Sequence, residues 1–160
     1  MRYFNFLVLA LGLVTAEDGS LAWLRYALVP SNKNINFLPS SILVLNSSTS
    51  SPVYTAGQEL RKGVNGILGV KLGTNKTTEA SSSIIIGTID GYQRLYGGLD
   101  EFHELIEDGF FLGTEGSNIL IIGQNERGAL YGAFEYLSRL AQNDLIPVSL
   151  VSNPHAPIRW

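Results

Sequence analysis

The fold is decided by residues 41–69, SILVLNSSTSSPVYTAGQELRKGVNGILG. The stretch opens with an apolar run of strand length at residues 41–46, and a Ser/Thr-rich loop follows. Pro52 suits the first turn of a helix, where a backbone N–H has no partner within the helix, and Ser51 before it can cap that helix. Residues 41–69 therefore predict a strand, a loop and a helix that ends near Gly69.

The helix predicted over residues 52–69 is amphipathic. Its apolar residues recur mostly at spacings of three and four, whereas its charged residues fall largely on the other side. The apolar positions are Val53, Ala56, Leu60, Val64, Ile67 and Leu68. This spacing predicts a helix with one buried face.

A second strand is predicted at residues 84–88, IIIGT, after a polar stretch at residues 74–83. Its continuous β-branched start is typical of a strand that is buried on both faces. Because the helix at 52–69 connects it to the strand at 41–46, we expect the two strands to be parallel and the crossover to be right-handed.

The clearest helix is capped by Asn125 and is expected to run from Glu126 to about Asn143. Gly128 and Gly132 lie on one of its faces. The helix carries charges, so this pair favours close packing on a sheet over a membrane dimer motif. The apolar stripe is predicted to comprise Leu130, Ala133, Phe134, Leu137, Leu140 and Ala141.

A hairpin and a last strand complete the order of elements. The apolar residues 110–112 and 119–122 flank turn-like residues 114–117, which predicts a β-hairpin, and residues 147–151 predict a final strand. The order strand, helix, strand, hairpin, helix, strand predicts an α/β domain of α+β-like character. We expect a mixed β-sheet with two main amphipathic helices, in two or three layers.

Composition sets bounds on function. The chain has 160 residues, of which 45% are hydrophobic and 16% charged, with a formal charge of −3 and no cysteine. That size fits one globular domain whose core alone must stabilise it. No basic stripe is present, so the sequence predicts no nucleic-acid partner.

Residues 1–16 predict a secretory signal peptide. Arg2 gives a positive start, an apolar run covers residues 4–14, and small residues precede the expected cleavage after Ala16, which leaves Glu17 as the first mature residue. The polar turn that follows disfavours a buried N-terminal element. The run is also shorter than the roughly 20 residues that span a bilayer. We therefore expect an extracellular protein with no membrane partner.

Two sequons accompany the signal peptide. Asn46-Ser47-Ser48 and Asn75-Lys76-Thr77 both fit the N-glycosylation pattern and lie in Ser/Thr-rich stretches that should be exposed. In a secreted eukaryotic protein, Asn46 and Asn75 are the predicted glycosylation sites.

The sequence shows no active site. The best candidate is the acidic segment at residues 100–108, where a helix would place His103 and Glu107 one turn apart, near Glu104 and Asp100. The His-Glu-x-x-His pattern of zinc hydrolases is absent, so a solvated acidic face is the favoured interpretation. Nucleophile elbows and phosphate or dinucleotide loops are absent as well. We therefore assign no catalytic, metal or cofactor-binding residue, and we place His155 in a linker.

Several stretches spread over the whole mature chain form a recognisable set. They are EDG at 17–19 with WLRY at 23–26, IIIGT at 84–88, EDGF at 107–110, GQNERGALYGAFEYL at 123–137 and SNPHAPIRW at 152–160. In this order they resemble the N-terminal domain of fungal α-glucuronidases, glycoside hydrolase family 67. That domain is similar to the small α/β domain preceding the barrel in β-hexosaminidases.

The resemblance implies a secreted enzyme that removes glucuronic acid, or its 4-O-methyl ether, from glucuronoxylan oligosaccharides without a cofactor. The family inverts the anomeric centre with carboxylates of a (β/α)₈ barrel. That barrel would begin just after Trp160, so no family catalytic acid maps onto this chain. Residues 17–151 would be an accessory domain and residues 152–160 a linker. Arg159 and Trp160 would lie at the barrel junction, and the full-length enzyme is a candidate homodimer.

Two alternatives stay open. The chain could be a free-standing carbohydrate-binding or interaction module. Its available aromatics, whose spacing suggests core and hairpin packing instead, are Trp23, Tyr26, Tyr92, Tyr96, Phe110 and Phe111. In the second alternative, the chain is a small independent hydrolase that uses Glu104 and Glu107. Whether the chain is itself an enzyme is therefore left undecided by the sequence.

Overall fold

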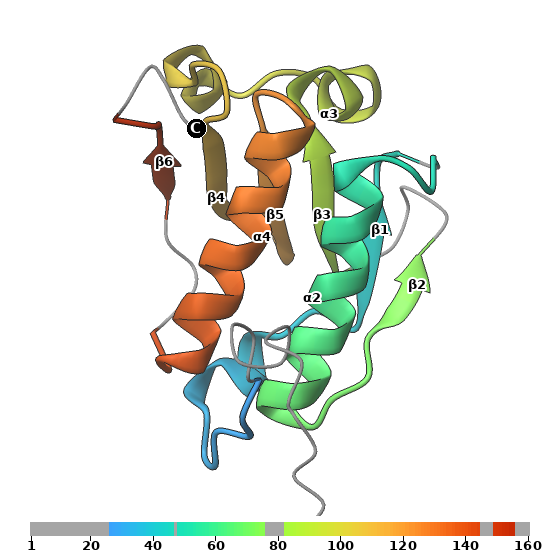
Figure 1. The fold of residues 1–160 in the computed structure, drawn as a ribbon, viewed down its shortest axis with the longest axis vertical. Coiled ribbons are helices and arrows are strands. Elements are labelled where there is room, and N and C mark those ends of the chain that lie inside the picture. The colour runs from blue at the N-terminus through green and yellow to red at the C-terminus, as the bar shows by residue number, and fades with distance from the viewer. Residues whose placement is uncertain (1–25, 47, 76–81, 145–148, 156–160) are drawn as a thin grey trace, which may run out of the picture.

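The computed structural model describes residues 26–46, 48–75, 82–144 and 149–155 and shows a mixed sheet with helices on both faces. In spatial order its strands are β2 (Gly73–Asn75), β1 (Ser41–Val44), β3 (Ser83–Thr88), β5 (Asn118–Gly123), β4 (Phe110–Glu115) and β6 (Leu150–Ser152) (Figure 1). The helices are α2 (Pro52–Leu68), α3 (Ile89–Tyr96) and α4 (Glu126–Ala141), with short 3-10 helices η1 (Lys33–Phe37) and η2 (Asp100–Glu104). The predicted α/β class is confirmed.

The strand pairing agrees with the expected parallel arrangement, with one addition. β1 and β3 are parallel, with Ile42 opposite Ile84, and β3 and β5 are also parallel. The helix α2 does not lead directly to β3, because the chain first forms the short edge strand β2 on the other side of β1. β4 and β5 form the predicted antiparallel hairpin, and β6 pairs with β4.

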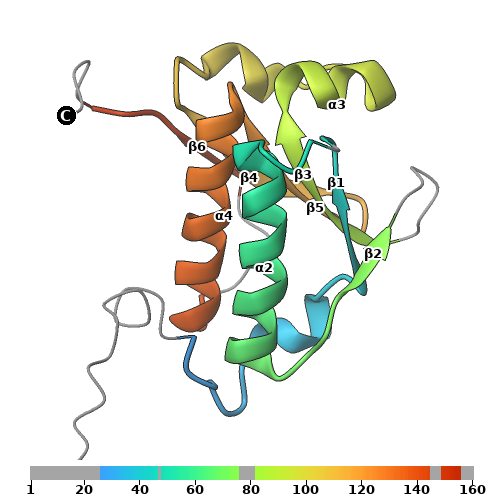
Figure 2. The same cartoon turned by 45° about the vertical axis from the view of Figure 1, so that its right-hand side comes forward.

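The larger core lies between the sheet and the helices α2 and α4. Figure 2 shows these two helices side by side over one face of the sheet. Ile84 and Ile86 of β3 belong to this core, whereas Ile85 between them belongs to the core on the opposite face. All three side chains are buried, so β3 is covered on both faces as its sequence predicts.

The smaller core is aromatic and lies beneath α3 and η2. Tyr92 of α3 contacts Phe102 of η2 edge to face, with ring centroids 5.5 Å apart, and Phe102 contacts Phe111 of β4 at 5.9 Å. The buried members of this core are Leu43, Ile85, Tyr92, Phe102, Leu105, Phe111, Leu120 and Ile122. The short helices α3 and η2 thus cover the second face of the sheet and make the domain three-layered.

Both predicted helix caps are present. The Oγ of Ser51 accepts a hydrogen bond from the Val53 amide at 3.1 Å, and the Oδ1 of Asn125 accepts one from the Gly128 amide at 2.9 Å. α2 ends at Gly69, which has the positive φ of 71° that glycine adopts without strain. The chain therefore enters and leaves its long crossover helix as the sequence indicates.

The predicted apolar stripe of α4 was partly wrong. Ala141 is exposed and Phe134 is only half-buried, whereas Tyr136 is buried. The buried face comprises Gly128, Ala129, Gly132, Ala133, Tyr136, Leu137 and Leu140. The two glycines belong to this buried face. A Cβ at Gly132 would lie 2.9 Å from Ile121 of β5, so a larger residue would not fit where the helix approaches the sheet.

Several predicted features lie outside the described residues, among them the signal peptide at 1–16 and the first two positions of the strand at 147–151. The observed strand is β6 at Leu150–Ser152. Within the part of the chain that the structure describes, no helix has the length and apolarity needed to cross a membrane.

Burial makes stability sensitive to alkaline pH. It raises the pKa of the Tyr136 hydroxyl above its usual value near 10. Above pH 10 the unfolded chain therefore releases a tyrosine proton that the folded chain keeps, so the free energy of unfolding falls by up to about 1.4 kcal/mol per pH unit. Urea unfolding of wild type and Tyr136→Phe should show profiles that diverge only above pH 10. Parallel profiles up to pH 11.5 would contradict this expectation.

Candidate functional site

The acidic segment does not form the helical pair that a metal would need. η2 ends at Glu104, so His103 and Glu107 do not share a helix. Their side chains are exposed, as is that of Glu104, whereas Phe102 and Leu105 of the same segment are buried in the aromatic core. Among the described residues, no group of three His, Cys, Asp or Glu side chains is placed to hold a metal ion.

The segment instead joins a polar network at the start of α4. The carboxylate of Asp108 accepts a hydrogen bond from Nδ2 of Asn125 at 2.8 Å. It also forms an ion pair with Arg127, whose Nε lies 3.0 Å from the same oxygen. A second Arg127 nitrogen lies 3.3 Å from Glu107. Asn125 caps α4 at the same time, so EDGF at 107–110 is fixed to the beginning of residues 123–137, the longest of the stretches that carry the family resemblance.

The last residues that the structure describes are fixed near the start of α4 as well. Oδ1 of Asn153 accepts a hydrogen bond from the Ile106 amide at 3.1 Å, and its Nδ2 donates to the Glu104 carbonyl at 2.9 Å. Beside it is a hollow of about 270 Å³, named the junction pocket, lined by Asp108, Phe110, Tyr131, Ser152, Asn153, Pro154 and His155. Three motifs that are far apart in sequence thus meet at one end of the sheet.

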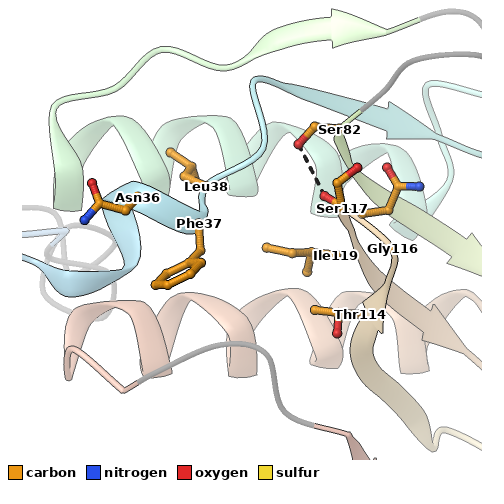
Figure 3. A pocket seen from close by; sticks show the side chains of 9 residues that line it. Asn36, Phe37, Leu38, Ser82, Thr114, Gly116, Ser117 and Ile119 are labelled. Carbon is orange, nitrogen blue, oxygen red and sulfur yellow. Dashed lines mark hydrogen bonds between the residues drawn. The ribbon is translucent and has the colours of Figure 1, made fainter.

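A second hollow lies between η1 and the tip of the hairpin and is named the Phe37 pocket. Its volume is about 300 Å³, and its lining residues are Asn36, Phe37, Leu38, Ser82, Thr114, Gly116, Ser117, Asn118 and Ile119. Figure 3 shows Phe37 and Ile119 lying in the hollow between η1 and the hairpin. Phe37 is 61% exposed, and none of the described residues that line the pocket carries a charge. The Ser82 hydroxyl donates to the Ser117 carbonyl at 3.2 Å.

Sequence reasoning missed Phe37, because η1 is too short to show an apolar period. Three of the six aromatic residues that the sequence analysis considered are buried. Tyr92, Phe110 and Phe111 are buried, which confirms the expected core and hairpin packing. Tyr26 and Tyr96 are half-buried, and Trp23 lies outside the described residues.

The two sequon asparagines have different surroundings. Asn46 follows β1 and is half-buried, and its amide nitrogen donates to both Ser51 and Glu126. Asn75 ends the edge strand β2, and its amide nitrogen donates to Oγ of Ser83 at 3.3 Å. Glycosylation of either asparagine stays a prediction. Arg159 and Trp160, the predicted junction contacts, lie outside the described residues.

Comparison with known proteins gives one consistent answer. The family model described as the glycosyl hydrolase family 67 N-terminus matches residues 22–136. A probable alpha-glucuronidase A of Aspergillus fumigatus is 50% identical over 96% of this chain and 19% of its own length. The alpha-glucuronidase of Hypocrea jecorina is 47% identical over 92% of this chain and 18% of its own. The alpha-glucuronidase A of Emericella nidulans is 44% identical over the whole chain and 20% of its own.

The chain spans about a fifth of the length of the curated relatives it matches. Among solved structures, a family GH115 4-O-methyl-alpha-glucuronidase aligns with 64% of this chain and 14% of its own, with a TM-score of 0.49 and 21% identity. The family match covers the central strands, α2, α3 and most of α4, including the Asp108–Asn125–Arg127 network. The chain therefore belongs to glycosyl hydrolase family 67, in which it corresponds to the N-terminal domain.

Proposed function

We propose that the chain is the noncatalytic N-terminal accessory domain of a secreted, xylan-debranching α-glucuronidase. The whole enzyme would hydrolyse glucuronic acid, or its 4-O-methyl ether, from glucuronoxylan oligosaccharides outside the cell. The observation that carries the proposal is the 44–50% identity, over 92–100% of the chain, to proteins named alpha-glucuronidases. Sequence similarity at that level over nearly the whole chain supports a shared role in the same kind of enzyme.

The geometry of the acidic residues supports a noncatalytic role. Glycosidases of the usual kind place two carboxyl groups about 5–9.5 Å apart on either side of the scissile bond. Here Glu104 and Glu107 are exposed and belong to one local segment that covers the aromatic core. Neither lines the junction pocket or the Phe37 pocket. Hydrolysis would then depend on the remaining part of the enzyme.

The junction pocket supports a role in bracing that remaining part. The hollow is lined in part by residues 152–155, the last that the structure describes. It combines the partly exposed ring of Tyr131 with the ionisable side chains of Asp108 and His155. Mixed apolar and polar surfaces of this kind are typical of interfaces between domains of one chain. We propose that the catalytic domain packs here.

An assay of the native gene product tests the proposal. We expect an intact mass several times that of this chain after deglycosylation, together with release of 4-O-methylglucuronic acid from substituted xylo-oligosaccharides. This chain alone should release none. Release by the chain alone, lost in Glu104→Gln but kept in the control Glu101→Gln, would instead establish an independent hydrolase.

A second candidate function is carbohydrate binding, and the Phe37 pocket favours it. An exposed aromatic ring beside uncharged hydroxyl and amide groups suits a neutral sugar better than a glucuronate, because a carboxylate binds best to a cationic side chain. Calorimetry with xylohexaose should give a weak, millimolar dissociation constant that Phe37→Ala abolishes and Ile35→Ala, an exposed neighbour on η1, preserves. Absence of heat at 10 mM ligand, roughly the weakest affinity of interest, would remove this candidate.

A further inference from the structure

Asn46 joins the N-termini of the two long helices. Its amide nitrogen donates to Oγ of Ser51 at 3.1 Å and to Oε1 of Glu126 at 2.7 Å. Ser51 is the N-cap of α2, and Glu126 is the first residue of α4. Figure 2 shows the first turns of these helices side by side at one end of the sheet. One side chain from the end of β1 thus connects both helices.

The Asn46 amide has no spare hydrogen for another bond. A primary amide nitrogen carries two hydrogens, and both have acceptors here. The remaining polar atom, Oδ1, accepts a hydrogen bond from the Ser48 amide at 2.9 Å. The bond to Glu126 is short and ends on a carboxylate, which makes it stronger than a bond between neutral groups. Ser51 is itself buried, so its hydroxyl has little access to water.

We propose that Asn46 is not a glycosylation site of the native domain, although it lies in a sequon. A glycan replaces one of the two amide hydrogens. The sugar would then have to occupy the position of Ser51 or Glu126, the atoms that now lie within hydrogen-bond distance of the nitrogen. A molecule that is glycosylated at Asn46 loses one of the two connections and must displace the side chain of Ser51 or Glu126.

The point at which the sugar is added determines how this should be measured. Oligosaccharyltransferase acts on the chain before it folds, so the amide is accessible at that moment. The conflict arises only when β1, α2 and α4 assemble. Glycosylation at Asn46 should therefore be depleted in the secreted, folded protein relative to the total cellular protein. This part of the inference rests on the proposed secretion, but the connection between the helices does not.

Two variants separate the sequon from the amide. Ser48→Ala removes the sequon and keeps Asn46, because only the Ser48 backbone amide contacts it, and the Ser48 hydroxyl has the exposed Ser50 as its partner at 3.0 Å. Asn46→Gln removes both the sequon and the connection. Produced in bacteria, Asn46→Gln should melt roughly 3 °C or more below wild type, and Ser48→Ala should stay within about 1 °C of it. Equal melting temperatures for the three proteins would refute the connection.

Secretion from yeast tests the modification itself. Glycopeptide mapping should find the Asn46 glycan at a fraction at least about tenfold lower in the secreted protein than in the cellular pool, and Ser48→Ala should be secreted at least as well as wild type. The proposal is overturned if secreted wild type carries the Asn46 glycan at the cellular fraction and melts like Ser48→Ala. The bacterial comparison does not depend on activity or secretion, so failure of the proposed enzyme function would leave it interpretable.

Discussion

Gly128→Ala is expected to destabilise the domain by roughly 2–4 kcal/mol, although alanine is the better helix former. Glycine to alanine within a helix ordinarily gains about 1 kcal/mol. Here the new Cβ would lie 2.2 Å from the carbonyl oxygen of Gly109. That oxygen is backbone, and it accepts a hydrogen bond from the Gln124 amide at 2.9 Å. It cannot yield as a flexible side chain would, so the steric conflict outweighs the gain in propensity.

Gly91→Ala is the matched control. Gly91 occupies the third position of α3, as Gly128 does in α4, and each amide donates to its helix N-cap. A Cβ at Gly91 would meet nothing closer than 3.5 Å, which is ordinary van der Waals contact. Urea unfolding should therefore show Gly91→Ala unchanged or stabilised by up to about 1 kcal/mol. Effects of the same sign for both variants would show that packing on the sheet is not the cause.

Tyr92→Ala should have a similarly large effect, a loss of roughly 3–5 kcal/mol. Tyr92 is 1% exposed, and its ring lies 4.9 Å from that of Tyr96 and 5.5 Å from that of Phe102, so it joins α3 to η2. Its hydroxyl also donates a hydrogen bond to Glu115 at the end of β4. Truncation would open the aromatic core of the second face, and the other side chains of α3 that pack on this core, Ile89 and Tyr96, are only partly buried.

Tyr92→Phe separates the ring from the hydroxyl. It keeps the packing and removes only the bond to Glu115, so its expected cost is about 1 kcal/mol. Urea unfolding, followed by near-ultraviolet circular dichroism for the aromatic core, measures both variants, and the exposed Gln93→Ala on the same helix serves as reference. Equal losses for Tyr92→Ala and Tyr92→Phe would mean that the hydroxyl, not the ring, holds α3.

The main elements could be predicted from sequence because each has a strong local signal. Ser51 and Pro52 mark the start of α2, Asn125 marks that of α4, and the isoleucine run marks β3. α3 has no such signal. It is eight residues long, contains a glycine, and buries Tyr92 alone, so its stability comes from tertiary packing that periodicity does not reveal.

The candidate site was less predictable for a related reason. The motifs at residues 107–110, 123–137 and 152–155 were visible separately, but the pairing of β6 with β4 and the Asn153 hydrogen bonds bring them together. The Phe37 pocket likewise depends on η1 meeting the hairpin tip. The glycine pair of α4 correctly predicted close packing on the sheet, but the apolar stripe was misplaced because it left these glycines out and included Phe134 and Ala141.

The anchoring of Asn153 determines the length of the tether between this domain and any domain that follows it. The effective length of a tether is counted from the last residue that is held in place. β6 and the two hydrogen bonds of Asn153 hold the chain up to the edge of the junction pocket, so the length of a tether to any following domain is counted from Asn153 and not from an earlier residue. Short tethers give effective concentrations in the millimolar range or above. An interface with a dissociation constant too weak to detect between separate molecules would then suffice to keep two such domains docked.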